Sequence, residues 1–164
     1  MKVQRDGFRM LQREQLLQEL VHDSYKAKHK LPEPSVCPRC SATFHEGRWT
    51  WRAAPTGTPQ HMCPACSRIM DEFPAGYVTV TGEFAHEHRD EITQLIKHCE
   101  LSEKAEHPLE RIMGIADVDD GLLVTTTDSH LARKITERLH RAFKGKMEFR
   151  YNKEDNLLRA RWSR

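Results

Sequence analysis

Residues 37–40 read Cys-Pro-Arg-Cys and residues 63–66 read Cys-Pro-Ala-Cys, and these matched pairs decide the fold around them. In a tight C-x-x-C turn both thiolates point toward one centre, and two such turns form a tetrahedral four-sulfur site that suits Zn²⁺. The 22 residues between the pairs leave room for one or two β-hairpins. The sequence therefore predicts a zinc ribbon over residues 35–72, with a structural ion held by Cys37, Cys40, Cys63 and Cys66.

Other uses of these cysteines have less support. Iron in the same four-thiolate cage remains an alternative. A redox dithiol normally needs one C-x-x-C beside a βαβ pattern, and disulfides need an oxidising compartment. The N-terminus has no apolar signal-peptide segment, and no run approaches 18 apolar residues. We therefore expect a cytoplasmic protein with no membrane contact, whose closed metal site leaves no open position for catalysis.

The charge of the chain is distributed unevenly. Of 164 residues, 30% are charged, and the net charge is only +2. Residues 71–128 nevertheless sum to −10, whereas residues 129–164 sum to +7, with 11 basic and 4 acidic residues. The basic end is suited to meet phosphate, and the acidic middle to face away from it or to bind a basic protein. A solvated surface of mixed sign is the simpler alternative.

The N-terminal segment, residues 1–34, is expected to be an amphipathic helix over residues 8–28 followed by a Pro-containing linker. This helix could dock RNA or protein, or pack on the rest of the chain, and the sequence favours neither. In the ribbon, Trp49 and Trp51 are two residues apart and would share one face of a strand. Filling the thin core of the ribbon is favoured over stacking on unpaired bases. His45 and His61 are not expected to be ligands, because four cysteines complete the cage.

Residues 75–164 are predicted to form an α+β domain. Strands are expected over residues 77–81, 110–118 and 122–127, helices over 84–104 and from Ser129 to Lys144, and two alternating strands at the end. Asp128 has the chemistry of a helix N-cap, and Gly145 that of a left-handed C-terminal residue. The order β-α-β-β-α-β is the ferredoxin-like split βαβ topology, here with one extra C-terminal strand. Many proteins with this fold bind RNA, although the fold alone does not prove it.

No catalytic site is expected. The glycines are scattered, so no phosphate-binding loop is present. Asp128, Ser129 and His130 are adjacent at a helix start and point in different directions, so they make no triad. His86 and His88 would need a third partner to bind a metal. Cys99 lies on an apolar helical stripe and is expected to be a buried small hydrophobe rather than a nucleophile.

Basic residues near the C-terminus are the predicted nucleic-acid contacts. Such a surface neutralises phosphates and makes binding depend on salt; the alternative is that these residues only solvate a helix and a strand. The predicted contacts are Arg133, Lys134, Arg138, Arg141 and Lys144 on the helix, and Arg150, Arg159 and Arg161 on the strands.

Three strings, at residues 63–76, 107–112 and 124–133, resemble a group of small bacterial proteins of unsettled function. That group is similar to the front part of the Nmd-three family, the archaeal and eukaryotic adaptors of the large ribosomal subunit. The resemblance covers about residues 35–162, and the cysteine knuckles are its specific part. It implies zinc binding and contact with the large subunit or its RNA. Nuclear export depends on further domains of the longer adaptors and is not carried over.

We therefore expect a non-enzymatic zinc-ribbon protein that binds the ribosome or ribosomal RNA, in subunit assembly or in ribosome hibernation under stress. No small-molecule substrate is inferred. A regulatory protein-interaction adaptor that uses residues 71–128 is the first alternative. A thiol-based redox sensor is the second.

Overall fold

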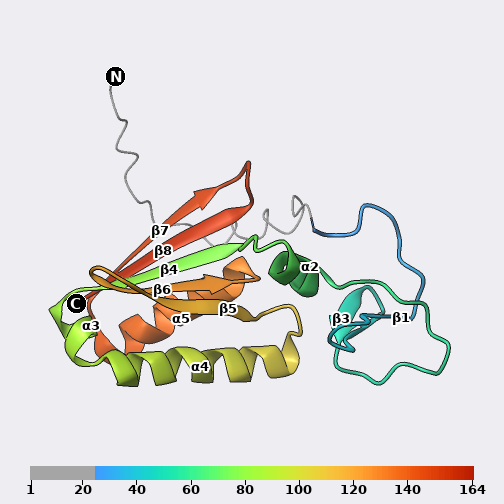
Figure 1. The fold of residues 1–164 in the computed structure, drawn as a ribbon, viewed down its shortest axis with the longest axis horizontal. Helices are drawn as coiled ribbons and strands as arrows, with labels where there is room; N and C mark the ends of the chain where they lie inside the picture. Colours follow the sequence, from blue (N-terminus) through green and yellow to red (C-terminus); the bar gives the residue numbers. More distant parts are fainter. Residues whose placement is uncertain (1–24) are drawn as a thin grey trace.

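The computed structural model describes residues 25–164, which form a small antiparallel sheet and then a five-stranded mixed sheet with helices (Figure 1). Most of the helix predicted over residues 8–28 lies outside the described residues. The part that is described, residues 25–28, has turn and bend conformation rather than helix. The observed class is α+β, as predicted.

The ribbon, residues 35–72, is a three-stranded antiparallel sheet followed by one short helix. Its central turn is tight because Glu46 and Gly47 both have positive φ, 50° and 76°, a backbone that matches the twist of a two-residue hairpin. The helix begins within the second C-x-x-C pair, with Cys63 as its N-cap and Pro64 as its first residue. The elements are β1 (Ser35–Val36), β2 (Thr43–His45), β3 (Arg48–Thr50) and α2 (Pro64–Met70).

The α+β domain, residues 75–164, contains the predicted strands and helices in the predicted order, with one difference. The single helix expected over residues 84–104 is two helices, because the backbone of His88 (φ −106°, ψ 27°) leaves the helical conformation between them. Asp128 caps the second long helix by accepting a hydrogen bond from the backbone N–H of His130 at 2.7 Å. The elements are β4 (Gly76–Thr81), α3 (Glu83–Glu87), α4 (Arg89–Glu106), β5 (Ile112–Val118), β6 (Gly121–Thr126), α5 (Ser129–Phe143), β7 (Lys146–Asn152) and β8 (Leu157–Ser163).

The order of the strands differs from the expected topology in one respect. A split βαβ sheet places the strand that follows α5 beside β4, but the observed order is β5-β6-β4-β8-β7. The extra strand β8 therefore lies inside the sheet, parallel to β4 and antiparallel to β7. The reason is burial, because Leu158, Ala160 and Trp162 on β8 are at most 2% exposed. β7 has fewer apolar side chains to bury and forms the edge.

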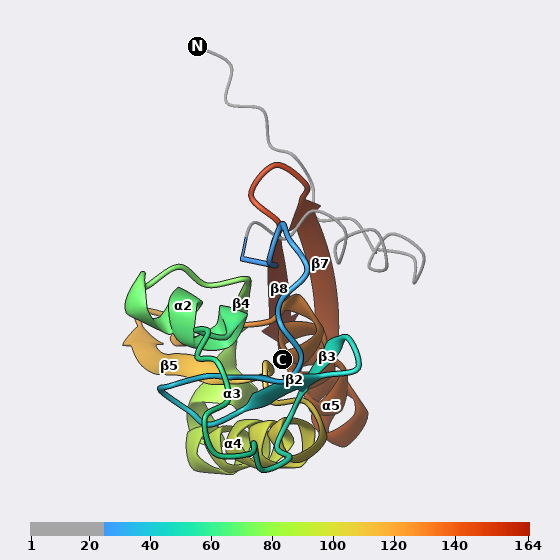
Figure 2. The ribbon, with the colours of Figure 1, turned by 90° about the vertical axis from the view of Figure 1, so that its right-hand side faces the viewer.

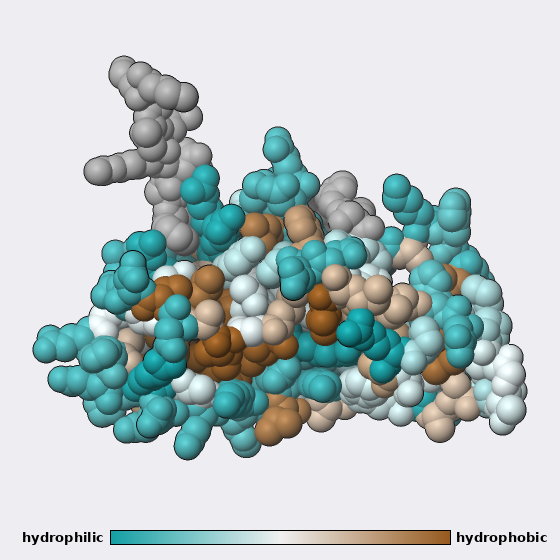
Figure 3. Space-filling model, in the orientation of Figure 1, coloured by the Kyte–Doolittle hydropathy of each residue, from teal (hydrophilic) through white to brown (hydrophobic). Residues whose placement is uncertain are grey.

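Helices cover one face of this sheet (Figure 2). The core consists of inward side chains such as Val78, Val124 and Trp162, packed against Ile96 of α4 and Ile135 of α5. Cys99 is fully buried in the same cluster, as predicted. The surface in the view of Figure 1 is mostly hydrophilic at its rim, with hydrophobic residues nearer its centre (Figure 3). Within residues 25–164, no helix has the length and apolar character needed to cross a membrane.

Candidate metal centre

The four predicted cysteines come together at one point of the ribbon. The Sγ atoms of Cys37, Cys40, Cys63 and Cys66 all lie within 4.8 Å of one another. A tetrahedral ion with sulfurs at about 2.3 Å holds them about 3.8 Å apart, and the Cys40 and Cys63 sulfurs are 3.7 Å apart. None of the cysteines forms a disulfide. The cluster can therefore hold a metal ion such as Zn²⁺.

Backbone groups of the knuckles orient these sulfurs. The N–H of Cys63 points to the Cys37 sulfur and the N–H of Cys66 to the Cys63 sulfur, each at 3.4 Å. Burial raises the pKa of the Cys37 thiol, but hydrogen bonds from the backbone of Cys63, Cys40 and Arg39 outweigh it and lower the value to about 7. Burial raises the pKa of Cys63, and neighbouring thiolates raise it further. Four thiolates in so small a volume therefore need a cation among them.

One cation from outside the ribbon reaches this cluster. Arg111, in the loop before β5, places Nη1 3.2 Å from the Cys66 sulfur and Nη2 3.1 Å from the Cys40 sulfur. Nη2 also lies 3.7 Å from the Cys63 sulfur. Burial lowers the pKa of the Arg111 guanidinium, but its hydrogen bonds to the Cys66 and Cys40 sulfurs outweigh burial and raise it. Sequence reasoning missed this residue, because 45 residues separate it from Cys66, the nearest of the four clustered cysteines.

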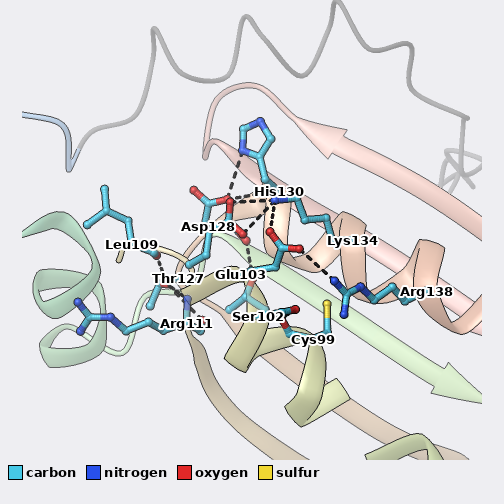
Figure 4. A network of polar contacts seen from close by, with 12 residues as sticks. Cys99, Ser102, Glu103, Leu109, Arg111, Thr127, Asp128, His130, Lys134 and Arg138 are labelled. Carbon is cyan, nitrogen blue, oxygen red and sulfur yellow. Dashed lines mark hydrogen bonds and ion pairs between the residues drawn. The ribbon is translucent and has the colours of Figure 1, made fainter. Parts of the chain in front are cut away.

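A second group of potential ligands, Glu103, His107 and Glu110, lies at the C-terminal end of α4. Here an ammonium group already contacts the carboxylates. Lys134 Nζ lies 2.5 Å from Glu103 Oε2 and 3.3 Å from both Glu110 oxygens. Arg138 approaches the other Glu103 oxygen at 3.3 Å (Figure 4). This group is therefore an ion-pair network that joins α4 to α5, and we do not assign it a metal.

The same network changes the interpretation of the basic helix. Lys134 and Arg138 are paired with Glu103, and Arg133 Nε contacts Glu137 at 2.8 Å on the same helix. Arg141 and Lys144 are exposed. Part of the charge asymmetry between residues 71–128 and residues 129–164 is thus satisfied within the chain.

The basic residues on the strands lie on the face of the sheet opposite the helices. Arg150 of β7, Arg159 of β8 and Tyr77 of β4 are in register across three strands. The guanidinium of Arg159 lies 5.1 Å from the centre of the Tyr77 ring, a cation–π distance. In the next row, Arg161 lies between Glu148 and Thr79. We call these six residues, Tyr77, Thr79, Glu148, Arg150, Arg159 and Arg161, the outer sheet patch.

The two tryptophans of the ribbon have different surroundings. Trp49 packs on the cysteine cluster and lies 5.5 Å from the Phe44 ring, so it fills the ribbon core as predicted. Trp51 lies beyond the end of β3 and is 40% exposed, so the expectation that it fills the same core is wrong. Its indole N–H instead donates to the carbonyl oxygen of Lys104 at 2.6 Å, which ties the ribbon to α4.

The histidines do not join the four-sulfur group. His45 approaches Glu46 at 3.6 Å, and His61 is exposed. His88 contacts Glu91 at 3.0 Å and stacks on Phe84. Among the described residues, His86 and His88 belong to no cluster of metal-ligating side chains. His130 contacts Asp128 at 3.2 Å beside the helix cap.

No protein-family model, no curated protein and no solved structure matches this chain. The comparisons therefore identify no family, and the similarity to ribosomal adaptors described above stays a prediction. The four-cysteine cluster and the α+β arrangement of the two sheets are established by the structure.

Proposed function

We propose that this protein is a non-enzymatic zinc-binding protein that binds single-stranded RNA through the outer sheet patch, with ribosomal RNA of the large subunit as its target. The ribbon needs the ion as a structural element, because its three strands span only 2 to 3 residues each. So small a sheet buries little apolar surface without a metal.

The observation that carries the RNA proposal is the row formed by Arg150, Arg159 and Tyr77. An aromatic ring on a sheet face gives a base a surface on which to stack, and neighbouring guanidinium groups neutralise the phosphates on either side of it. In the next row Glu148 lies opposite Arg161 and offsets its charge, so the positive charge of the patch is centred on Arg150 and Arg159. Stacking tolerates any base, so the patch is expected to prefer unpaired RNA over a particular sequence.

The outer sheet patch is a better candidate than the helix that was predicted to share this role. Lys134 and Arg138 would have to leave Glu103 in order to bind phosphate, and that exchange costs the hydrogen bonds they already make. Of the five predicted contacts on that helix, only Arg141 and the C-cap residue Lys144 are exposed. The ribosomal target itself rests on the resemblance of the cysteine knuckles.

The alternative of a protein-interaction adaptor that uses the acidic residues 71–128 has less support from the structure than from the sequence. Glu103 and Glu110, two of the acidic residues of residues 71–128, are engaged with Lys134. Asp117 is paired with Arg89. The acidic charge that remains for a basic partner is correspondingly smaller.

The test is binding of the zinc-loaded chain to a fluorescent twelve-nucleotide unstructured RNA across a salt series. We expect Tyr77→Ala to weaken binding by about 1–3 kcal/mol, the usual contribution of one stacked base. Arg159→Gln should lower the salt slope by about 1, because one phosphate contact is lost. Sedimentation with purified 50S subunits then tests the ribosomal target.

Arg141→Gln is the matched control, since it removes the same charge from an exposed position on α5. Equal losses for Arg141→Gln and Arg159→Gln would mean non-specific attraction and would contradict the proposal. RNA binding without sedimentation on subunits would contradict only the ribosomal target.

A further inference from the structure

The loop that carries Arg111 is fixed to the α+β domain on every side. The backbone N–H of Arg111 donates to Thr127 Oγ1 at 2.9 Å, and the carbonyl oxygen of Arg111 accepts from the Thr127 N–H at 2.9 Å. The side chain is held as well, because Arg111 Nε donates to the carbonyl oxygen of Pro108 at 2.8 Å. The guanidinium therefore has its direction set before it reaches the ribbon (Figure 4).

This direction leads straight into the cysteine cluster. The two terminal nitrogens of Arg111 face three of the four sulfurs, and the residue is only 7% exposed. A planar fork of N–H donors suits two acceptors on one side better than an ammonium group does. Sulfurs bound to a metal keep lone pairs that can accept such hydrogen bonds.

Charge explains why a buried arginine is tolerated at this place. Four thiolates around a divalent ion carry a net charge of −2, and a buried charge is costly unless an opposite charge is close by. Arg111 supplies +1 at hydrogen-bond distance. The converse also holds, since without the anionic sulfurs the guanidinium would be buried with no opposite charge among its hydrogen-bond partners.

We propose that Arg111 is a functional part of the metal centre, which stabilises the dianionic tetrathiolate complex and makes attachment of the ribbon to the α+β domain depend on the bound metal. The proposal rests on the proposed function only in that the cage holds zinc, and it does not require RNA binding. Metal occupancy would then decide how the ribbon and the outer sheet patch are placed relative to each other.

A second contact at the same junction reports on this attachment. Trp51 hydrogen-bonds Lys104, and the Arg111 guanidinium lies 5.7 Å from the centre of the Trp51 ring. The three tryptophans thus mark three places. Trp49 marks the ribbon core, Trp51 the junction, and Trp162, whose indole N–H donates to the Lys144 carbonyl oxygen at 2.7 Å, the core of the α+β domain.

The experiment measures zinc affinity and the three indole N–H signals in ¹⁵N–¹H NMR spectra of the full chain, assigned by single Trp→Phe variants. Arg111→Met removes the charge with little change in volume, and a loss of 10- to 100-fold in zinc affinity is expected from competition with a chromogenic chelator. Arg111→Lys should fall between Arg111→Met and the unchanged chain. Arg89→Met, which removes an exposed paired arginine, is the matched control and should bind zinc normally.

In zinc-saturated Arg111→Met, the Trp51 signal should move to the position of a free indole while those of Trp49 and Trp162 stay in place. Removing zinc from the unchanged chain should move the Trp51 and Trp49 signals and leave Trp162. Should Arg111→Met fail to fold, Thr127→Val loosens the same loop and is expected to lose about half as much zinc affinity on a logarithmic scale.

Zinc affinity of Arg111→Met equal to that of the unchanged chain would overturn the proposal, as would a Trp51 signal that stays in place in that variant. Failure of the unchanged chain to bind zinc would instead reject the metal part of the proposed function. Failure of the Arg111 proposal is therefore seen in the Arg111→Met variant, and failure of the proposed zinc binding is seen in the unchanged chain.

Discussion

The indole N–H of Trp51 donates a hydrogen bond of 2.6 Å to the carbonyl oxygen of Lys104, 53 residues further along the chain. This bond satisfies a carbonyl in the last turn of α4, where the helix itself offers no partner. One side chain thus both satisfies a carbonyl in the last turn of a helix and joins the ribbon to that helix.

Replacing the Trp51 indole should lower the free energy of unfolding less than replacing the indole of Trp162, which is also hydrogen-bonded. Trp51→Phe removes one hydrogen bond at a site that is 40% exposed, so we expect a loss of about 0.5–1.5 kcal/mol in the free energy of unfolding. Trp162→Phe makes the same change in a fully buried side chain and leaves both a cavity and an unpaired Lys144 carbonyl, so its loss should be larger. Urea unfolding of the two variants measures both, and equal losses would contradict this ranking.

Zinc content should distinguish the four metal ligands from the fifth cysteine, Cys99. Cys63→Ser is expected to reduce bound zinc from about one ion per chain to almost none, since a hydroxyl is a poor substitute for a thiolate ligand. Cys99→Ser should keep the ion, because Cys99 is buried among the side chains of the α+β core. Elemental analysis of the purified chains gives the ratio, and loss of zinc from Cys99→Ser would contradict the assignment of the four ligands.

Cys99 should also make stability depend on alkaline pH. Burial raises the pKa of its thiol from an ordinary value of 9.0 to about 11. Between these values the unfolded chain loses the proton and the folded chain keeps it, so the contribution of Cys99 to stability is complete below pH 9 and falls as pH rises toward 11. The difference in unfolding free energy between the unchanged chain and Cys99→Ala should therefore shrink from pH 8 to pH 10. A constant difference would contradict the raised pKa.

The ion pairs between α4 and α5 give the opposite pH dependence. Burial and the charge of Asp128 raise the pKa of Glu110, and Lys134 partly offsets them. Lys134→Met leaves Glu103 and Glu110 without this ammonium and should cost about 1–2 kcal/mol at pH 7, a value reduced because Lys134 is partly exposed. The loss should fall toward pH 4, because the raised pKa of Glu110 lets its carboxyl gain a proton as the pH falls. Thermal unfolding at the two pH values tests this, with Lys146→Met, from an exposed pair, as the control.

Much of this fold could be predicted from the sequence. The C-x-x-C spacing identifies four residues that the structure brings within 4.8 Å of one another. Local periodicity also identifies α4, α5 and the strands, because each of them buries one face and exposes the other. The cap at Asp128 is also predictable from the sequence, since capping is a local property of a few consecutive residues.

Contacts between distant segments could not be predicted in this way. The place of β8 inside the sheet depends on which strand has most apolar surface to bury, and the alternation of Leu158, Ala160 and Trp162 was the signal that could have indicated it. Arg111 falls within the strand expected over residues 110–118, although β5 begins at Ile112, and the alternation of a strand does not connect a side chain with sulfur atoms of the ribbon. The pairing of Lys134 with Glu103 is likewise a contact between two helices, and the charge of each helix alone does not reveal it.

The position of β8 has a consequence for how the protein is made. β4 and β8 pair in parallel although about eighty residues separate them, and β7 contacts the rest of the sheet only through β8. The nascent chain therefore cannot close its hydrophobic core until residues 157–163 have left the ribosomal exit tunnel. Until then β4 presents an open edge and β7 has no partner, which makes folding slow and leaves unpaired strands exposed to aggregation.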